Sequence, residues 1–558
     1  MTDAFEEGRR FGWQRSSAPR LRRSWFGRLG GAGGAAFTLA VLFALPLSAQ
    51  PNPPPNPAPE SAGEEAAAPV AAGNGALEAE IGKLRAEVTA LREELARAER
   101  DEAAGRQRSE QILLLQTRLA ELEARLAAGE PAPPQAGEAE TAPGGLKLTP
   151  GAQAWLRGEV RTKPTLGRTD AQTVRRILQR ARLQLNAQQG PVTAFVQVQD
   201  AREWGFETST ISNEGNVDLH QGYLEVSGST PCYSGFLRAG RQEITYGSQR
   251  LIGDLGWDPN ARAFDALRLH GEDRRFEADA FLAVLAPPQT FTLPAADDPT
   301  VTETFRSTGS VLGGLRLGAD VHEAFQPELY MLWDRSRPTE RLPAQDRNVY
   351  SPGLRVSGDT SAGLSYEAEG YLQFGDVTGR DHSAWAFAIG VAYTYEQSPI
   401  KPTARAGYSM ASGEACENAP GEECGASESR EFFNFYPLNH AYYGMLDLFG
   451  WRNVRDLEIG VGATPLSVLE ATLTYHFFQL HEARGRWSDA AGATIAAGDF
   501  TNTQNTLGHE IDLVVTYRPW EFLALQPGYG IFVPTGAGEV LGGPGTQQFF
   551  YLMASATL

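Results

Sequence analysis

The stretch Arg180-Ala181-Arg182-Leu183-Gln184-Leu185-Asn186 alternates polar and apolar residues without interruption. Successive side chains of a β-strand point to opposite faces, so one face carries arginine and amide groups and the other only alanine and leucine. A strand that separates membrane lipid from a wet lumen needs these two faces. Because lipid cannot hydrogen-bond an open sheet edge, such strands cross a bilayer as a closed barrel.

The same alternation continues from about residue 152 to the C-terminus. Connections between the expected strands are short at 189–191 and 519–523 and long at 287–309 and 412–451. This alternation of short and long connections is typical of outer-membrane barrels. The sequence therefore predicts an all-β fold, an 18-stranded antiparallel transmembrane β-barrel in a Gram-negative outer membrane. We expect its strands near 152–161, 174–188, 192–201, 217–227, 235–244, 263–270, 275–285, 310–318, 327–335, 351–358, 364–374, 384–397, 402–411, 453–462, 468–480, 509–518, 524–533 and 547–558.

The N-terminal part has the pattern of an exported protein. Arginines precede an apolar run at 35–47, and a small-residue cleavage pattern ends at Ala49, so residues 1–49 are predicted to be a signal peptide. Residues 50–75 form a Pro/Ala-rich linker and residues 129–147 a second linker. The barrel is expected over 148–558.

Residues 76–128, between the linkers, are predicted to form an α-helical coiled coil in the periplasm. Apolar residues recur there with heptad spacing. The heptad pattern is interrupted at Glu102, Gly105 and Ser109 and then resumes. Because a lone helix with so narrow an apolar stripe is marginal in water, the pattern favours self-association through 77–126. A solvated charged helix is the alternative. The seam residues are Leu77, Ile81, Leu84, Val88, Leu91, Leu95, Ala98, Leu115, Leu119, Leu122 and Leu126.

The composition limits the kinds of partner and activity that we expect. The net charge of −19 argues against a nucleic-acid partner. Cys416 and Cys424 share one polar segment and predict a loop disulfide, with two free thiols as the alternative, while Cys232 is expected in a turn. No ligand spacing points to a metal and no motif to a cofactor. His509 and Ser555 fall on different strands without a third partner, so we do not expect an enzyme.

The alternation assigns a set of charged and polar side chains to the lumen. Strand 2 contributes a basic face, and descending strands contribute further arginines, while carboxylates come from their ascending neighbours and from late strands. The predicted pore-lining residues are Arg176, Arg180, Arg182, Gln184, Asn186, Arg268, Arg316, Arg355, Arg405, Glu367, Glu369, Glu510 and Asp512.

Two interpretations of these arginines remain open. A ring of arginine in a pore of low dielectric constant would select anions. Alternatively, arginines such as Arg316 and Arg355 form cross-strand ion pairs that brace the wall, with Glu328 as a shared partner. For Arg180 and its neighbours on strand 2 no carboxylate is evident on the third strand, which favours selectivity there.

Three ordered motifs carry a resemblance to a known family. They are GRQEITYGSQRLIG at 240–253 with Trp257 and RAFDALR at 262–268, PLNHAYYGMLD at 437–447 with GWRN at 450–453, and GHEID at 508–512. The chain resembles the alginate-export family of outer-membrane proteins. The resemblance implies an eighteen-stranded barrel whose arginine-rich, electropositive lumen passes an anionic polyuronate outward. Two features differ from that family: the turn at 519–523 is short where those channels carry a periplasmic plug, and the coiled coil is reminiscent of trimeric phosphate-selective porins.

These patterns favour a passive, anion-preferring outer-membrane channel that exports an anionic exopolysaccharide such as an alginate-like polyuronate. An uptake porin for small anions or general solutes, oligomerised by its coiled coil, is one alternative. A barrel that tethers the envelope is another. The expected partners are outer-membrane lipid and, because an amphipathic strand ends the chain at Leu558, the barrel-assembly machinery.

Overall fold

The computed structural model describes residues 145–162, 173–206, 216–294, 302–339, 346–417 and 428–558. The predicted signal peptide at 1–49, the linker at 50–75 and the coiled coil at 76–128 lie outside the described residues, as does most of the second linker at 129–147. What the structure describes is therefore the predicted barrel.

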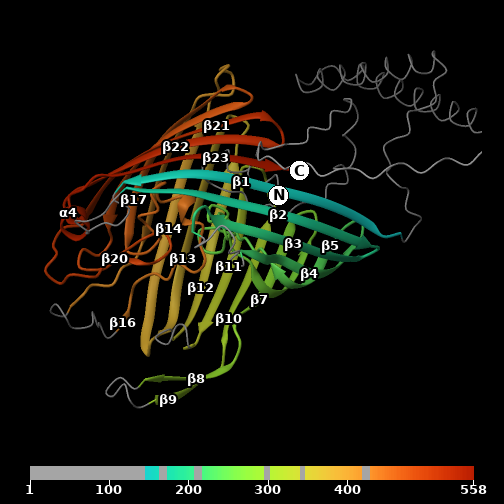
Figure 1. Cartoon of the computed structure of the whole chain (residues 1–558), viewed down its shortest axis with the longest axis horizontal. Coiled ribbons are helices and arrows are strands. Elements are labelled where there is room, and N and C mark those ends of the chain that lie inside the picture. The colour runs from blue at the N-terminus through green and yellow to red at the C-terminus, as the bar shows by residue number, and fades with distance from the viewer. Residues whose placement is uncertain (1–144, 163–172, 207–215, 295–301, 340–345, 418–427) are drawn as a thin grey trace, which may run out of the picture. The chain divides into compact units, whose positions relative to one another are not determined.

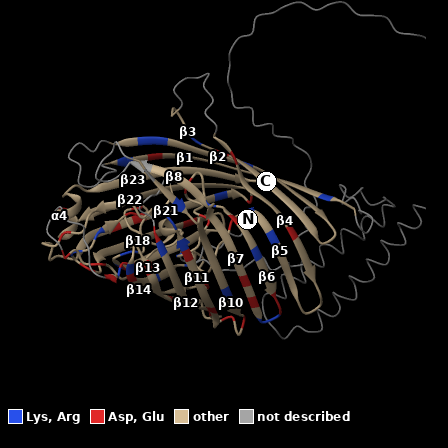
Figure 2. Cartoon of the chain, turned by 90° about the horizontal axis from the view of Figure 1, so that it is seen from below, with Lys and Arg blue, Asp and Glu red and all other residues tan. Residues whose placement is uncertain are grey.

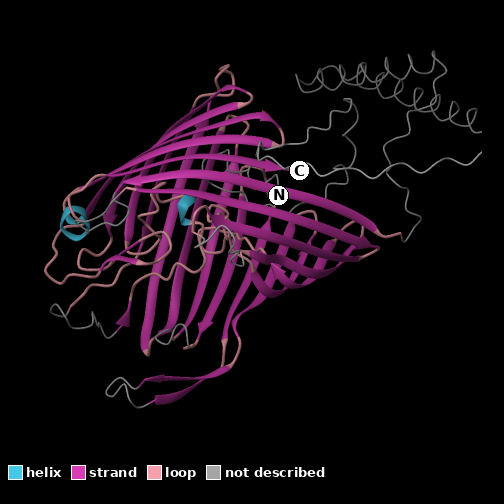
Figure 3. Ribbon diagram, viewed as in Figure 1, coloured by secondary structure: helices cyan, strands magenta, loops and turns pink. Residues whose placement is uncertain are grey.

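Eighteen antiparallel strands form one closed ring, which confirms the predicted barrel (Figures 1 and 3). β1 (Lys147–Thr162) pairs with β2 (Val174–Gln189) on one side and with β23 (Gln547–Thr557) on the other. The sheet is thus closed by its first and last strands and has no unpaired edge in the ring. The other strands of the ring are β3 (Val192–Glu203), β4 (Val217–Ser229), β5 (Ser234–Gln242), β6 (Phe264–Glu272), β7 (Phe276–Ala286), β10 (Ser310–Ala319), β11 (Gln326–Ser336), β12 (Arg347–Asp359), β13 (Leu364–Val377), β14 (Arg380–Thr394), β15 (Thr403–Ala411), β17 (Val454–Leu466), β18 (Leu469–Leu480), β21 (Thr506–Trp520) and β22 (Leu523–Pro534).

The first strand starts earlier than its expected start near residue 152. Lys147 pairs with Gln188 and Gly151 with Gln184, so the pairing with β2 extends the strand through Pro150. Proline and glycine weaken the strand signal of this segment in the sequence. Here the long partner strand decides the conformation.

Short elements occupy several connections that were expected to be irregular. No helix among the described residues is long and apolar enough to cross a membrane. The short elements are the hairpin of β8 (Gln289–Pro294) and β9 (Thr302–Ser307), β16 (Glu428–Ser429) beside β14, β19 (Trp487–Ser488) paired with β20 (Thr494–Ala496), a 3-10 turn at Asn439–Ala441, and α4 (Ala537–Gly542).

The two ends of the barrel differ in their connections. At the short-turn end, residues 190–191 join β2 to β3 and residues 521–522 join β21 to β22. At the long-loop end, residues 243–263 follow β5 and residues 412–453 lie between β15 and β17. One connection at this end is tight: Thr378 and Gly379 join β13 to β14 with φ of 51° and 77°, as a type I′ hairpin turn requires.

The strand faces are sorted as the alternation predicts. On β2, Leu183 is 69% exposed, whereas Arg180 and Arg182 are 4% and 5% exposed. The same outward exposure of leucine recurs around the ring, for example at Leu267 and Leu282. The outer face is therefore apolar, and the charged side chains point into the barrel.

We predict that Leu183→Arg destabilises the folded barrel by about 2–4 kcal/mol, because it puts a charge on the lipid face. The measurement is reversible unfolding in lipid vesicles. The matched control, Gln184→Arg on the adjacent inward position, should cost much less. Equal losses for the two variants would contradict the assignment of faces.

Candidate functional site

Two long connections turn back into the barrel from its long-loop end. Residues 243–263 form the first inner loop and residues 430–453 the second, and we call the two together the plug (Figure 1). Their apolar side chains are deeply buried: Ile244, Ile252, Tyr443 and Trp451 are all 0% exposed. The barrel interior thus contains a packed core of its own, which the sequence did not predict.

The two inner loops are bonded to each other through their backbones. Tyr436 donates its N–H to the Leu251 carbonyl at 2.8 Å, and Gly253 donates to the Tyr436 carbonyl at 2.9 Å. Leu438 donates to the Gln249 carbonyl at 2.9 Å. These bonds form a short parallel bridge, so the loops behave as one body.

The plug is fixed to strands on different sides of the ring. Arg250 forms an ion pair with Glu369 on β13 at 2.7 Å, and Tyr246 donates its hydroxyl to Asp279 on β7 at 2.8 Å. On β1, Arg161 forms an ion pair with Asp447 at 3.3 Å. Although burial opposes its ionisation, the neighbouring His440 and Arg161 lower the pKa of Asp447.

The predicted pore residues Glu510 and Asp512 lie beneath the second inner loop rather than in open space. Their carboxylates accept the backbone N–H groups of Leu446 at 2.9 Å and Met445 at 3.0 Å. Gly444 precedes them with φ of 80°, and a Cβ there would lie 2.5 Å from Glu510. Only glycine allows so close an approach to the wall.

Backbone strain is concentrated in the plug. Five of the seven non-glycine residues with positive φ in the described chain lie there: Gln249, Leu255, Ala261, Asp447 and Asn453. Side chains disfavour this conformation, at a cost of about 1–3 kcal/mol each, and it persists where surrounding contacts enforce it. The plug is therefore held in shape by its contacts with the wall.

One side of the wall carries a series of alternating charges, which runs from β6 to β13 (Figure 2). Arg268 pairs with Asp279 at 2.8 Å, and Arg316 bridges Glu277 and Glu328, each at 2.6 Å. Arg355 continues the series from Glu328 at 3.0 Å to Glu367. Farther on, Arg405 pairs with Glu458 at 2.8 Å. The geometry of these predicted pore arginines is that of the cross-strand bracing interpretation.

The arginines of β2 find partners that the sequence did not suggest. Arg176 pairs with Glu159 on β1 at 2.7 Å, and Arg182 pairs with Glu243 of the first inner loop at 3.2 Å. Farther along the same face, Gln184 accepts the side-chain amide of Gln197 at 2.7 Å. Asn186 follows, half-buried. The carboxylate partners of Arg176 and Arg182 come from β1 and from the first inner loop, not from the third strand, so ion pairing has to be considered for both beside selectivity.

Arg180 differs from the other predicted pore arginines, since it has no carboxylate partner among the described residues. It is 4% exposed and donates to the backbone carbonyls of Gly256 and Asp258 at 3.2 and 3.3 Å. Its guanidinium lies 5.1 Å from the ring of Trp155, and its Nε is buried without a hydrogen-bond partner. Glu243 and Asp254 act on this guanidinium electrostatically, but neither is bonded to it. A buried charge without a directly bonded counter-charge is costly, so this position is suited to an incoming anion.

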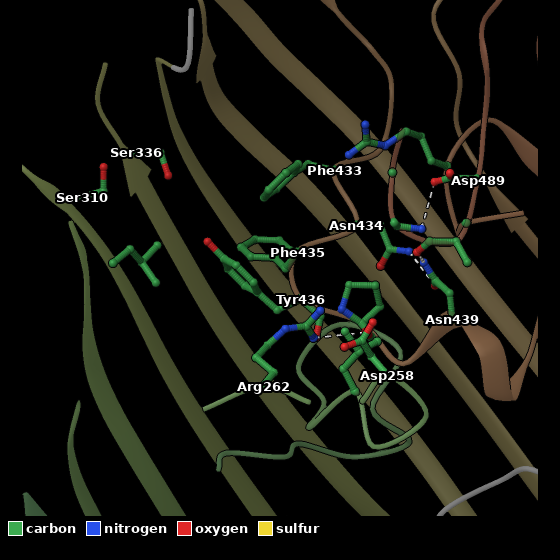
Figure 4. Close-up of a pocket in the computed structure, with 18 of the residues that line it drawn as sticks. Asp258, Arg262, Ser310, Ser336, Phe433, Asn434, Phe435, Tyr436, Asn439 and Asp489 are labelled. Atoms are coloured by element: carbon green, nitrogen blue, oxygen red, sulfur yellow. Dashed lines mark hydrogen bonds between the residues drawn. The ribbon is translucent and has the colours of Figure 1, made fainter. Parts of the chain in front are cut away.

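A cavity of about 1150 Å³ lies against the plug and is lined by both inner loops and by strand ends next to the long connections (Figure 4). We call it the vestibule. Its floor contains Trp257, stacked on His440 with ring centroids 3.8 Å apart. The Arg157 guanidinium covers the other face of Trp257 at 3.7 Å. The family motifs contain Trp257 and His440, so that resemblance was the one signal in the sequence that pointed to them.

Two of the three cysteines lie in described connections between strands. Cys416 is disulfide-bonded, and its predicted partner Cys424 lies outside the described residues. Cys232 is a free, exposed thiol in the turn between β4 and β5. Within the described ranges, no group of three or more His, Cys, Asp or Glu side chains is arranged to hold a metal ion.

A closed barrel with an apolar outer face and a charged lumen defines an outer-membrane channel protein. The sequence model of the alginate export family matches residues 146–543. The chain belongs to this family, which confirms the resemblance seen in its motifs. No relative was found among curated protein sequences.

Solved structures with a similar fold include proteins of two bacteria, one of them described as an outer membrane protein. OccAB4 of Acinetobacter baumannii is 13% identical, with a TM-score of 0.45, over 73% of this chain and 98% of that one. OpdL of Pseudomonas aeruginosa is 10% identical, with a TM-score of 0.47, over 74% and 99%. OpdK of the same organism is 10% identical, with a TM-score of 0.46, also over 74% and 99%.

We predict that Arg250→Ala loosens the plug, because it leaves Glu369 buried without its ion pair, a change that costs about 3–5 kcal/mol in protein interiors. Hydrogen exchange at the amides of Tyr436 and Leu438 should accelerate while the barrel strands stay protected. The control is Arg241→Ala, which removes an exposed pair with Asp265. Unchanged exchange in Arg250→Ala would refute this role.

Proposed function

We propose that the protein is a passive channel, and not an enzyme, that prefers anions and exports an acidic polysaccharide such as an alginate-like polyuronate. Its long-loop end would face the cell exterior, as the loops of outer-membrane barrels do. The proposal rests on the environment of Arg180. Its buried guanidinium faces the lumen and has no carboxylate partner among the described residues.

The surroundings of Arg180 support an anion-binding face. Arg157 and Arg180 both lie against Trp155, at 5.0 and 5.1 Å from its ring. Across β1 and β2, four inward arginines make ion pairs with only three carboxylates of the described chain, which are Glu159, Glu243 and Asp447. Arg180 is a fifth inward arginine, and it has no such pair. This excess of positive charge in a space shielded from water lowers the energy of a negative solute.

A carboxylate of the solute would replace weaker partners of Arg180. The guanidinium now donates to two backbone carbonyls, whereas a carboxylate offers charge-assisted, bidentate bonds. For this exchange the segment 256–258 of the first inner loop has to move away from β2. Because the two inner loops are bonded to each other, passage of a polymer would displace the plug as one body.

We predict that Arg180→Ala shifts the reversal potential of single channels, under a salt gradient in a planar bilayer, toward that of a nonselective pore. Block by added polyuronate should weaken in the same variant. Arg175→Ala, an exposed arginine on the same strand, is the matched control and should leave both properties unchanged. A wild-type pore that is nonselective or cation-selective and ignores the polymer would refute the proposal.

Self-association is a separate part of the proposal, supported by the heptads at 77–126. We predict that chemical crosslinking of the full chain gives a ladder of oligomers and that deletion of residues 77–126 abolishes it, because the apolar seam is lost. A full chain that remains monomeric, and behaves as the deletion variant does, would refute oligomerisation through this segment.

A further inference from the structure

The vestibule is large for the passage of small ions. Its volume of about 1150 Å³ is at the upper end of what small-molecule sites enclose. It lies directly against the plug, since residues of both inner loops line it. This inference rests on the proposed function in one respect: an exported polymer would pass through this space.

An aromatic strip lines one side of the vestibule. Phe433, Phe435 and Tyr436 of the second inner loop lie in a row along the cavity (Figure 4). The ring centroids of Phe433 and Phe435 are 5.0 Å apart, and the edge of Tyr436 meets Phe264 at 5.5 Å. Phe433 and Tyr436 are partly exposed. The Arg347 guanidinium lies 3.9 Å from the centre of the Phe433 ring, so a ligand can stack there only on the part of the ring that Arg347 leaves uncovered.

The charges around this strip are balanced. Three arginines and three aspartates contribute to the lining, and two of the arginines already have carboxylates of their own. Arg347 pairs with Asp334 at 2.8 Å, and Arg452 pairs with Glu431 at 3.2 Å. The vestibule therefore lacks the surplus of positive charge that β1 and β2 carry, and it offers an anion no comparable gain.

Polar groups complete the site on both sides of the strip. Asn434 donates its side-chain amide to Asn439 at 2.8 Å, and Asn439 donates to a backbone carbonyl at 2.7 Å, so both amides are held in place. The hydroxyls of Ser310 and Ser336 lie across the cavity from the aromatic rings (Figure 4). Apolar rings flanked by fixed hydrogen-bonding groups match a molecule with apolar faces and a rim of hydroxyls.

We propose that the vestibule is an oligosaccharide-binding site that recognises the faces and hydroxyls of sugar rings rather than their charge. Sugar C–H faces would lie on Phe433 and Tyr436, and ring hydroxyls would bond to the amides and to the charged side chains. The inference goes beyond the anion preference assigned to Arg180, because the two sites use different residues and different chemistry.

The test is isothermal titration of the full chain, folded in detergent, with maltotetraose, cellotetraose and tetramannuronate as probes. We expect binding of the acidic probe and of at least one neutral probe, and a loss of about tenfold in affinity for Phe433→Ala, the size expected for one aromatic contact. Phe305→Ala, an exposed ring on β9 at the same end of the barrel, is the matched control and should bind as the wild type does.

Two results would overturn the inference: binding of the acidic probe alone, or affinities that Phe433→Ala leaves unchanged. Protection of the Tyr436 and Leu438 amides in hydrogen exchange shows whether the plug of that variant remains folded. If the plug of Phe433→Ala is unfolded, Tyr436→Phe is tested instead. This variant keeps the aromatic ring and should retain the affinity for the sugars, because their faces stack on that ring. A loss of affinity in Tyr436→Phe would also overturn the inference. Arg180→Ala should leave binding of the neutral probes intact while it alters ion selectivity, so the two proposals fail independently.

Discussion

Arg250 and Glu369 lie 2.7 Å apart, and both side chains are almost fully buried in the barrel. Pairing of arginine with carboxylate inside the closed sheet is the interaction on which the rest of the structure depends. The same pairing links β7 to β13 across the wall and attaches β1 to the second inner loop. Because each buried charge needs its partner, removing one of them affects both the wall and the plug.

The same need for a partner distinguishes Arg180 from the other inward arginines. Nearly every inward arginine predicted from the sequence has a carboxylate, so the number of arginines alone does not make the lumen electropositive. The excess charge is confined to one face, on β1 and β2, and there the carbonyls of Gly256 and Asp258 cover Arg180. The proposed anion preference and the position of the plug are therefore coupled through one loop segment.

The barrel could be predicted from the sequence because the information is local. Alternation with a period of two assigns a face to each residue of a strand, and this was enough for the strand count and for the orientation of Arg180 and Leu183. The start of β1 was missed because pairing with β2 overrides the weak propensity of Pro150 and Gly151.

The plug could not be predicted in this way. The inner loops have no periodicity, and their direction depends on contacts between distant residues, such as Arg250 with Glu369 and Leu446 with Glu510. The partner of Arg182 was missed for the same reason, since Glu243 belongs to the first inner loop and not to the neighbouring strand. The family motifs at 240–253 and 437–447 fall mainly in these loops, so the resemblance indicated the region but not its geometry.

In the proposed function the plug lies in the path of the polymer and has to move. A plug tied to the wall by a disulfide between Leu446→Cys and Gly530→Cys tests this movement, because a Cβ at position 530 would lie 2.6 Å from the Leu446 side chain. The background carries Cys232→Ser, and the same background without the new pair controls for reduction of the native disulfide at Cys416. The measurement is efflux of labelled oligouronate from proteoliposomes. Efflux should be lost in the oxidised variant and restored on reduction. Equal efflux in both states would show that the plug does not have to move.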